Sequence, residues 1–322
     1  MIFQKAYGPL RVNSNSELLN VLNIYSPNLS SSSYLISYDV ESLFTNVPLS
    51  EVIDITTNYL YNVNNCKKPP INKDVFKKLL EYATSGIFSY NGNYFCQIDG
   101  VTMGSPLGPT LANIFLAHYE TDWQSFDFSP KFYYRYVDDI ICIFDNSMNC
   151  NSFFDFINNQ HSNLKFTCEH GNKEIPFLDI EIKLDLDCIH TSIYRKDTFT
   201  GLLLNYNAIC PLQWKKGLII GMLNRAFNVC SNWHLLHIEF EKITKMLIEN
   251  NYPRYFVLNI IKHFLYTKLD SKIDICDSTN VERKTYYFKI PYIGQTSDNF
   301  KKKLTILFKK FDIKTQIVFN ST

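Results

Sequence analysis

Residues 133–144, near the middle of the chain, constrain the fold more than any other stretch. Their sequence, YYRYVDDIICIF, places two adjacent aspartates between two runs of aromatic and branched apolar residues. The runs predict two strands, and the Val-Asp-Asp centre predicts a tight turn between them. Adjacent carboxylates repel each other at neutral pH, and a divalent cation bound to both removes that repulsion. Aspartate is also common in turns for structural reasons alone, so the dipeptide by itself leaves both interpretations open.

The composition fits a folded protein with a sizeable core. The chain has 322 residues, enough for two domains, and 46% of them are hydrophobic, which argues against global disorder. The net charge is +1, so any binding of nucleic acid must depend on local basic surface. The nine cysteines show no zinc spacing, and neither a signal peptide nor an apolar run of about 20 residues is found. We therefore expect a soluble intracellular protein with reduced thiols and no membrane contact.

A third aspartate, Asp39, stands at the end of an apolar segment. Residues 34–38 predict a buried strand, and residues 50–61 predict an amphipathic helix after it. Sheets of α/β proteins place ligand-binding groups at such strand ends, which favours a functional role for Asp39. A turn aspartate without function is the alternative.

A loop rich in glycine and proline follows at residues 100–109, with the sequence GVTMGSPLGP, and residues 110–120 predict an amphipathic helix. Glycine lets a backbone approach a flat ligand closely, and proline stiffens the approach. The loop lacks the Lys-Ser/Thr ending of a Walker loop. An ordinary strand-to-helix connection is the alternative.

The rest of the chain predicts a mixed region followed by a helical one. In the mixed region we expect helices at 17–22 (capped by Ser16), 73–85 (capped by Asn72) and 151–160, a hairpin at 88–97 around Asn91-Gly92, strands at 164–169 and 177–182 around a turn at Gly171-Asn172, and a strand at 189–194. Beyond residue 205 we expect helices at 217–230, 233–250 and 254–269, then a tail with a strand at 286–292, a basic helix around Lys301–Lys303 and a strand at 315–319.

Three of these segments, in this order, suggest one chemistry. Nucleotidyl transfer with two metal ions about 4 Å apart requires carboxylates that converge from different strands. Asp39 on one strand and Asp138-Asp139 on a neighbouring hairpin would supply them.

In this order the segments resemble the motifs of reverse transcriptases, most closely those of Penelope-like retroelements. Residues 37–49 resemble motif A, 103–109 motif B and 136–139 motif C, while 176–181 resemble the primer grip and 192–201 the segment entering the thumb. The resemblance covers roughly residues 34–320. Motif C alone is common, but the ordered set is specific.

The resemblance implies an α+β fold, in which a polymerase palm, an antiparallel sheet with packed helices, is followed by a helical thumb. It divides the chain into an N-terminal segment at 1–33 (a remnant of fingers or a linker), a palm at 34–200, and a thumb with a C-terminal extension at 201–322. The only positive charges before Asp39 are Lys5 and Arg11, so we expect the fingers to be largely missing and the chain to be a truncated element or a piece of a longer protein.

The resemblance also implies roles at the reaction centre. Asp39 and Asp138 would ligate two Mg²⁺ ions, for which Mn²⁺ could substitute, and Asp139 would assist. The backbone at Val40 would touch the metal-bound triphosphate. Phe44 matches the sugar gate that excludes a 2′-hydroxyl, with a core phenylalanine as the alternative.

Further roles concern the nucleotide and the two nucleic-acid strands. Met103 and Gly104 would pack against the incoming nucleotide and the template base, and Phe177 and Leu178 would position the primer. Arg195 and Lys196 would meet a nucleic-acid backbone, with a salt-bridged surface pair as the alternative.

The implied function is RNA-directed DNA polymerisation, with an RNA template, a DNA primer and dNTPs as partners. Two alternatives remain open: a nucleic-acid-binding remnant with weak or no catalysis, and a structural protein with a chance Asp-Asp turn. Residues 292–296 resemble half of a GIY-YIG nuclease motif, but no Gly-Ile-Tyr stands about ten residues before it, so we do not expect a nuclease. A partner chain could supply fingers or an endonuclease. We expect action in the nucleus, with the cytoplasm as the alternative.

Overall fold

The computed structural model describes residues 11–29, 32–62, 69–102, 104–123, 125–185, 188–270, 286–310 and 315–320. The chain divides into two compact units, and the division falls between Tyr194 and Arg195. We call these unit 1 and unit 2 and describe each by itself. The domain boundaries expected at 33 and 200 stay predictions.

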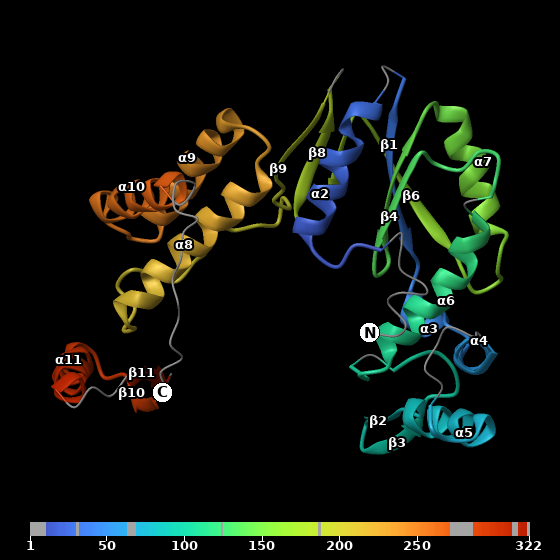
Figure 1. Ribbon diagram of the computed structural model, residues 1–322, viewed down its shortest axis with the longest axis horizontal. Coiled ribbons are helices and arrows are strands. Elements are labelled where there is room, and N and C mark those ends of the chain that lie inside the picture. The colour runs from blue at the N-terminus through green and yellow to red at the C-terminus, as the bar shows by residue number, and fades with distance from the viewer. Residues whose placement is uncertain are drawn as a thin grey trace. The chain divides into compact units, whose positions relative to one another are not determined.

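A four-stranded antiparallel sheet forms the centre of unit 1 (Figure 1). Its strand order is β4-β5-β1-β6, so β1 lies in the interior between β5 and β6. An interior strand fits the apolar sequence of β1, because both of its edges are paired and most of its side chains are buried. The strands are β1 (Tyr34–Val40), β4 (Phe132–Tyr136), β5 (Asp139–Phe144) and β6 (Phe166–Asn172).

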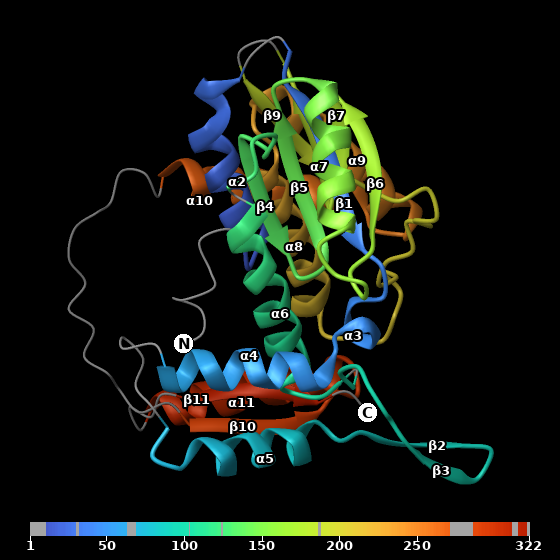
Figure 2. The same ribbon diagram turned by 90° about the vertical axis from the view of Figure 1, so that its right-hand side faces the viewer.

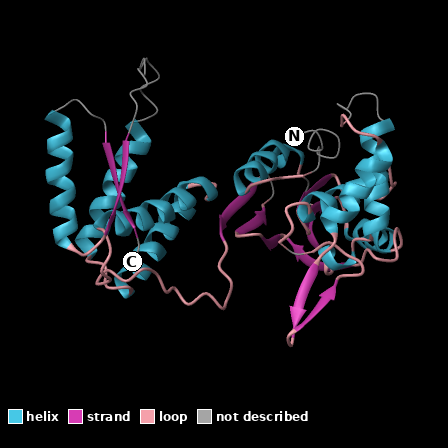
Figure 3. Ribbon diagram, turned by 90° about the horizontal axis from the view of Figure 1, so that it is seen from below, coloured by secondary structure: helices cyan, strands magenta, loops and turns pink. Residues whose placement is uncertain are grey.

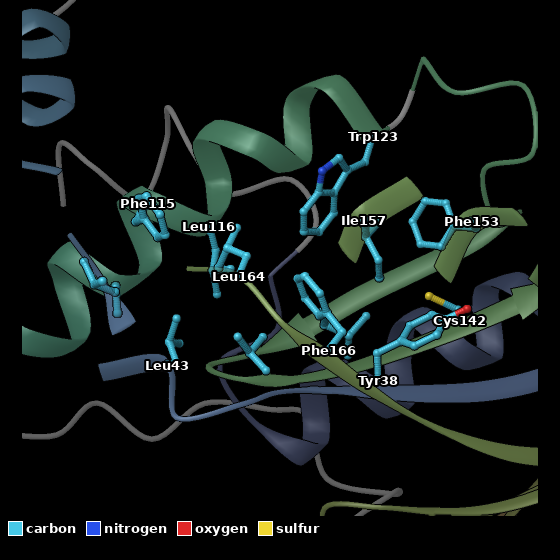
Figure 4. Close-up of a cluster of buried hydrophobic side chains, with 14 of the residues drawn as sticks. Tyr38, Leu43, Phe115, Leu116, Trp123, Cys142, Phe153, Ile157, Leu164 and Phe166 are labelled. Atoms are coloured by element: carbon cyan, nitrogen blue, oxygen red, sulfur yellow. The ribbon is translucent and has the colours of Figure 1, made fainter. Parts of the chain in front are cut away.

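Helices α6 (Gly108–Trp123) and α7 (Ser147–Asn158) pack against this sheet and form its main core. In the close-up of Figure 4, Trp123 of α6 and Phe153 of α7 lie over Phe166 of β6 and Tyr38 of β1. The rings of Trp123 and Phe166 are 5.6 Å apart in an edge-on contact. Each fully buried side chain of this size stabilises the fold by about 1.5–3 kcal/mol, so the core holds the sheet rigidly.

The N-terminal helix α2 (Asn15–Tyr25) also belongs to unit 1. It buries Leu18, Leu19 and Leu22, and the short 3₁₀ helix η1 (Ser26–Asn28) follows it. The expected cap at Ser16 was wrong. The Ser14 side chain accepts the hydrogen bond from the Glu17 N–H, because the helix starts two residues earlier than the apolar pattern suggested.

Three helices and a hairpin separate β1 from the glycine–proline loop. They are α3 (Leu43–Asn46), α4 (Leu49–Asn62), α5 (Lys73–Thr84), β2 (Ile87–Tyr90) and β3 (Asn93–Cys96). The cap at Asn72 and the turn at Asn91-Gly92 are confirmed. All eight residues of the two hairpin strands are exposed, and Figure 2 shows the hairpin extending beyond the end of α5.

A three-stranded sheet completes unit 1, with β7 (Glu174–Phe177), β8 (Ile180–Leu184) and β9 (Ile189–Ile193) in sequential order. Two expectations were wrong here. The strand expected at 177–182 is broken by a turn at Leu178-Asp179, because Leu178 takes a positive φ of 56° that its sequence does not signal. The turn expected at Gly171-Asn172 comes at Lys173 instead. Gly171 lies inside β6, where a β-carbon would be only 2.6 Å from the Glu174 carbonyl oxygen.

Unit 2 is built mainly from helices, with one two-stranded sheet (Figure 3). The three expected helices are present as α8 (Leu212–Val229), α9 (Trp233–Glu249) and α10 (Arg254–Asp270). Helix α8 begins five residues earlier than expected, because Gly217 is tolerated inside it. The tail forms β10 (Tyr286–Pro291), α11 (Gln295–Lys310) and β11 (Thr315–Asn320), with the two strands parallel. Within the described ranges, no helix is long and apolar enough to cross a membrane.

Candidate active site

The antiparallel pairing of β1 with β5 brings the predicted carboxylates together. Asp39 and Asp139, a hundred residues apart in sequence, are direct cross-strand partners, which corresponds to a Cα separation of about 4.5–5.5 Å. Asp138 lies in the adjoining turn, and its carbonyl oxygen accepts a hydrogen bond of 3.3 Å from the Val40 N–H. Three acidic residues from two segments therefore meet at one end of the central sheet.

The electrostatics of this end combine partial burial with neighbouring negative charges. The pKa of Asp39 is raised by partial burial first, then by the negative charges of Asp138 and Glu41, against a smaller lowering by the Val40 N–H. Asp39 is nevertheless exposed, and Asp138 and Asp139 are half-buried. None of the three side chains is fully buried, and a bound cation would relieve the repulsion between their carboxylates.

The turn that presents Asp138 is strained. Val137 and Asp138 connect the paired residues Tyr136 and Asp139, and Val137 has a φ of 56°. Branched residues rarely adopt a positive φ, and such strain costs about 1–3 kcal/mol. The Val137 carbonyl oxygen accepts a hydrogen bond of 2.8 Å from Nη1 of Arg135. The surrounding structure therefore stabilises a backbone conformation that is unfavourable for valine.

The glycine–proline loop is joined to the segment after β1. The Val101 N–H donates a hydrogen bond of 2.6 Å to the Phe44 carbonyl oxygen. Gly100 has a φ of +78°, and a β-carbon there would lie 2.5 Å from the Thr45 carbonyl oxygen. Phe44 is half-buried, with its ring 4.0 Å from where a β-carbon of Gly108 would be. The start of α6 and the segment after Asp39 are therefore held side by side.

The other residues predicted to meet the nucleotide or primer differ in exposure. Gly104 is exposed, whereas Met103 lies outside the described residues. The side chains of Val40 and Phe177 are buried, so only their backbones could meet a ligand directly. Leu178 is half-buried at its strained turn. The roles assigned to these residues stay predictions.

Arg195 and Lys196 belong to unit 2. Two nitrogens of the Arg195 guanidinium donate to the two carboxylate oxygens of Glu239 on α9, one at 2.9 Å. The Glu239 side chain is only 4% exposed. Arg195 is thus engaged in a structural ion pair, the alternative recognised from the sequence, while Lys196 is exposed. A contact of either with nucleic acid stays a prediction.

The sequence interpretation missed two residues beneath the turn, Arg135 of β4 and Glu120 of α6. Their side chains are 1% and 7% exposed, and they form a two-pronged ion pair with contacts of 2.5 and 3.0 Å. Burial alone would lower the pKa of Arg135, but Glu120 outweighs this and raises it. One signal was available: an arginine in the middle of an otherwise apolar strand predicts a buried ion pair, because charged side chains are seldom buried unpaired.

Comparison with known families adds to this geometry. Residues 11–170 match the family model described as reverse transcriptase (RNA-dependent DNA polymerase). This segment is a reverse transcriptase domain. It includes all of β1, β4 and β5 and therefore all three clustered aspartates. Residues 202–262, which span α8, α9 and part of α10, match a second model, the animal helix-turn-helix domain.

Solved structures share the fold. Telomerase from Candida albicans, in complex with the TWJ fragment of telomeric RNA, has a TM-score of 0.50 at 12% identity over 86% of this chain. Apo telomerase from Candida tropicalis has a TM-score of 0.51 at 13% identity over 83% of this chain. The chain spans 56% and 52% of the lengths of these two telomerases. No curated protein matches the sequence significantly.

The expected fold class is confirmed. Unit 1, which contains the matched residues 11–170, has the α+β architecture of a polymerase palm. The chain continues into a helical thumb. At these identities the telomerase structures show the fold alone.

Proposed function

We propose that this protein is an RNA-directed DNA polymerase of a retroelement, which extends a DNA primer with dNTPs along an RNA template. The observation that carries the proposal is the pairing of Asp39 with Asp139 across β1 and β5, beside Asp138, inside a reverse transcriptase domain. Carboxylates that converge from two segments are what nucleotidyl transfer requires.

The aspartate cluster fits magnesium. Its donors are carboxylate oxygens only, and the pKa of Asp39 is raised by partial burial first and then by the negative charges of Asp138 and Glu41. In the described part of the chain, no three His, Cys, Asp or Glu side chains are gathered closely enough to hold a metal ion. Mg²⁺ in nucleotide enzymes is commonly bound by one or two carboxylates plus substrate phosphates and water, so Asp39 and Asp138, assisted by Asp139, would be sufficient. Mn²⁺ accepts the same oxygen ligands.

When bound, the metal ions would activate the primer hydroxyl and neutralise charge on the triphosphate. The chain's own residues would orient the reactants. The Val40 backbone lies beside Asp39 and Asp138, where the triphosphate would bind. Phe44, held by Val101, is positioned near the start of α6 and would contact the sugar of the incoming nucleotide, excluding a 2′-hydroxyl. Met103 and Gly104 would contact its base.

The nucleic-acid partners are proposed on the same basis. Phe177, Leu178 and Lys196 would contact the primer–template, and the thumb would bind it through exposed basic side chains such as Lys242 and Lys245 of α9. The helix-turn-helix match over this region supports a nucleic-acid-binding role. The motif order and the 192–201 segment support a Penelope-like element as the origin.

Primer extension tests the proposal. With an RNA template, a DNA primer, dNTPs and Mg²⁺, we expect the wild-type chain to extend the primer and Asp39→Asn to lower the rate by about 10²–10³-fold, the usual effect of removing one charge-stabilising group. Asp155→Asn, which neutralises an exposed carboxylate on α7, is the matched control and should extend as wild type does.

The outcomes separate the candidate functions. Binding of an RNA–DNA hybrid without extension would favour the nucleic-acid-binding remnant. Absence of both binding and extension at low salt, where electrostatic binding is strongest, would refute the polymerase and the remnant together.

A further inference from the structure

A buried cluster of polar side chains lies directly beneath the aspartate turn. Arg135 is its centre: Nε and Nη2 donate to the two carboxylate oxygens of Glu120, and Nη1 donates to Oδ1 of Asn113 at 2.7 Å. The Tyr133 hydroxyl donates to the same Glu120 carboxylate at 2.7 Å. We call Asn113, Glu120, Tyr133 and Arg135 the Arg135 cluster.

The cluster contacts the turn through a hydrogen bond from Arg135. Nη1 of Arg135 also donates to the carbonyl oxygen of Val137, the residue with the positive φ immediately before Asp138. A buried guanidinium–carbonyl bond is charge-assisted and short, which makes it strong enough to offset the strain at Val137. The position of Asp138 therefore depends on a side chain two residues before the turn.

The cluster is anchored on both sides. Asn113 and Glu120 belong to α6, whose N-terminus follows the glycine–proline loop. The Arg135 carbonyl oxygen accepts a hydrogen bond of 3.0 Å from the Val12 N–H, so the backbone of β4 is fixed as well. A guanidinium held by a two-pronged carboxylate on α6 has little freedom to rotate, because the fork fixes its plane.

We infer that Arg135 is a positioning residue for the metal-binding aspartates: it holds the strained Val137 turn against α6 and so sets the place of Asp138 relative to Asp39. The inference rests on the proposed function. A lysine cannot replace the arginine, since a single ammonium group cannot form the fork with Glu120 and reach the Val137 carbonyl together. Loss of such an outer hydrogen-bond partner typically weakens metal binding or activity by about 10–100-fold.

Metal binding by the full chain provides a readout that does not depend on catalysis. Mn²⁺ serves as the probe, and its free concentration is measured by electron paramagnetic resonance. We expect Arg135→Lys to weaken Mn²⁺ binding by about 10–100-fold. Tyr133→Phe is the matched control, because it removes a hydrogen bond to Glu120 but none to the turn. It should lower the unfolding temperature and leave Mn²⁺ affinity unchanged.

A rescue variant tests the cause. Glycine adopts a positive φ without steric cost, so Val137→Gly removes the strain that Arg135 offsets. In the double variant Arg135→Lys/Val137→Gly we expect most of the lost Mn²⁺ affinity and of the lost primer-extension rate to return. Equal Mn²⁺ affinity in Arg135→Lys and Tyr133→Phe, or no recovery in the double variant, would overturn the inference.

Two further results keep the test decisive. If Arg135→Lys does not fold, Arg135→Met/Glu120→Leu replaces it, since it removes both buried charges together, which is often close to neutral for stability, and with them the bond to the Val137 carbonyl. We then expect weaker Mn²⁺ binding, and unchanged binding would refute the inference. A wild-type chain that neither binds Mn²⁺ nor extends primers refutes the proposed function instead.

Discussion

The ionised form of Asp39 is required for the proposed metal binding but destabilises the folded state. Its raised pKa means that the folded state binds a proton at this carboxyl more tightly than the unfolded chain does. The ionised form at neutral pH therefore opposes folding. The stability that proton binding contributes is present in acid and is lost as the pH rises through the folded pKa.

The first residue-scale prediction concerns pH. Asp39→Asn, which removes the charge, should raise the unfolding temperature at pH 7 without metal, by about 1–3 °C because solvent screens a largely exposed group. The difference in unfolding temperature between this variant and the wild type should vanish as the pH falls towards about 4, where the wild-type aspartate becomes protonated. Calorimetric scans across this range measure it. A rise in unfolding temperature that stays constant with pH, or a fall at pH 7, would contradict the raised pKa of Asp39.

Gly100 carries a second residue-scale prediction. Gly100 and Gly92 have almost equal positive φ angles, +78° and +77°, but only Gly100 lies against the Thr45 carbonyl, whereas Gly92 faces open space. Alanine at either position should cost about 1–2 kcal/mol for the left-handed backbone. Gly100→Ala should cost about 1–3 kcal/mol more, because its methyl group must displace main chain. Denaturant unfolding measures the difference, and equal losses would refute the close contact between the two segments.

At the scale of elements, the start of unit 2 is fastened to α9 by Arg195 and Glu239. The same segment was predicted to meet nucleic acid, so one side chain has two candidate roles. Truncating a partner of a buried ion pair leaves an uncompensated charge, whereas replacing both partners by apolar residues is often close to neutral.

This difference gives the element-scale prediction. Arg195→Ala should lower the free energy of unfolding by about 3 kcal/mol, since it leaves Glu239 buried and unpaired, and Arg195→Met/Glu239→Leu should recover most of that loss. Chemical denaturation measures both. Fluorescence anisotropy measures the affinity of each variant for an RNA–DNA hybrid. If Arg195 also contacts nucleic acid, the double variant will recover stability but not this affinity. An unchanged stability in Arg195→Ala would contradict the structural role.

At the scale of the whole molecule, function depends on local features rather than on overall charge. The chain carries 32 basic and 31 acidic residues, so it has no general attraction for nucleic acid. Its two units match two different family models, a reverse transcriptase and an animal helix-turn-helix domain. Each unit thus has its own resemblance to a known family.

Much of this could be predicted from the sequence because the signals were local. An apolar run located β1, and helical patterns located α4, α8, α9 and α10. The Asn91-Gly92 dipeptide located the turn of the β2–β3 hairpin. Each of these signals depends on neighbouring residues alone. The order of the segments that carry the aspartates, a strand followed by a hairpin, also predicted their convergence, and the pairing of Asp39 with Asp139 agrees with it.

The sequence by itself determined which residues can bind a metal and the order along the chain of the segments that carry them. Only the tertiary structure decided that Leu178 and Val137 turn the chain with positive φ angles, and that Arg135 lies buried against Glu120. The buried charge of Arg135 is unfavourable in its own strand, and Glu120 of α6 stabilises it as an ion pair. Held in this way, Arg135 donates a hydrogen bond to the carbonyl oxygen of the strained Val137. The pattern of residues in β4 alone does not contain this partner, because α6 is a separate element of the chain.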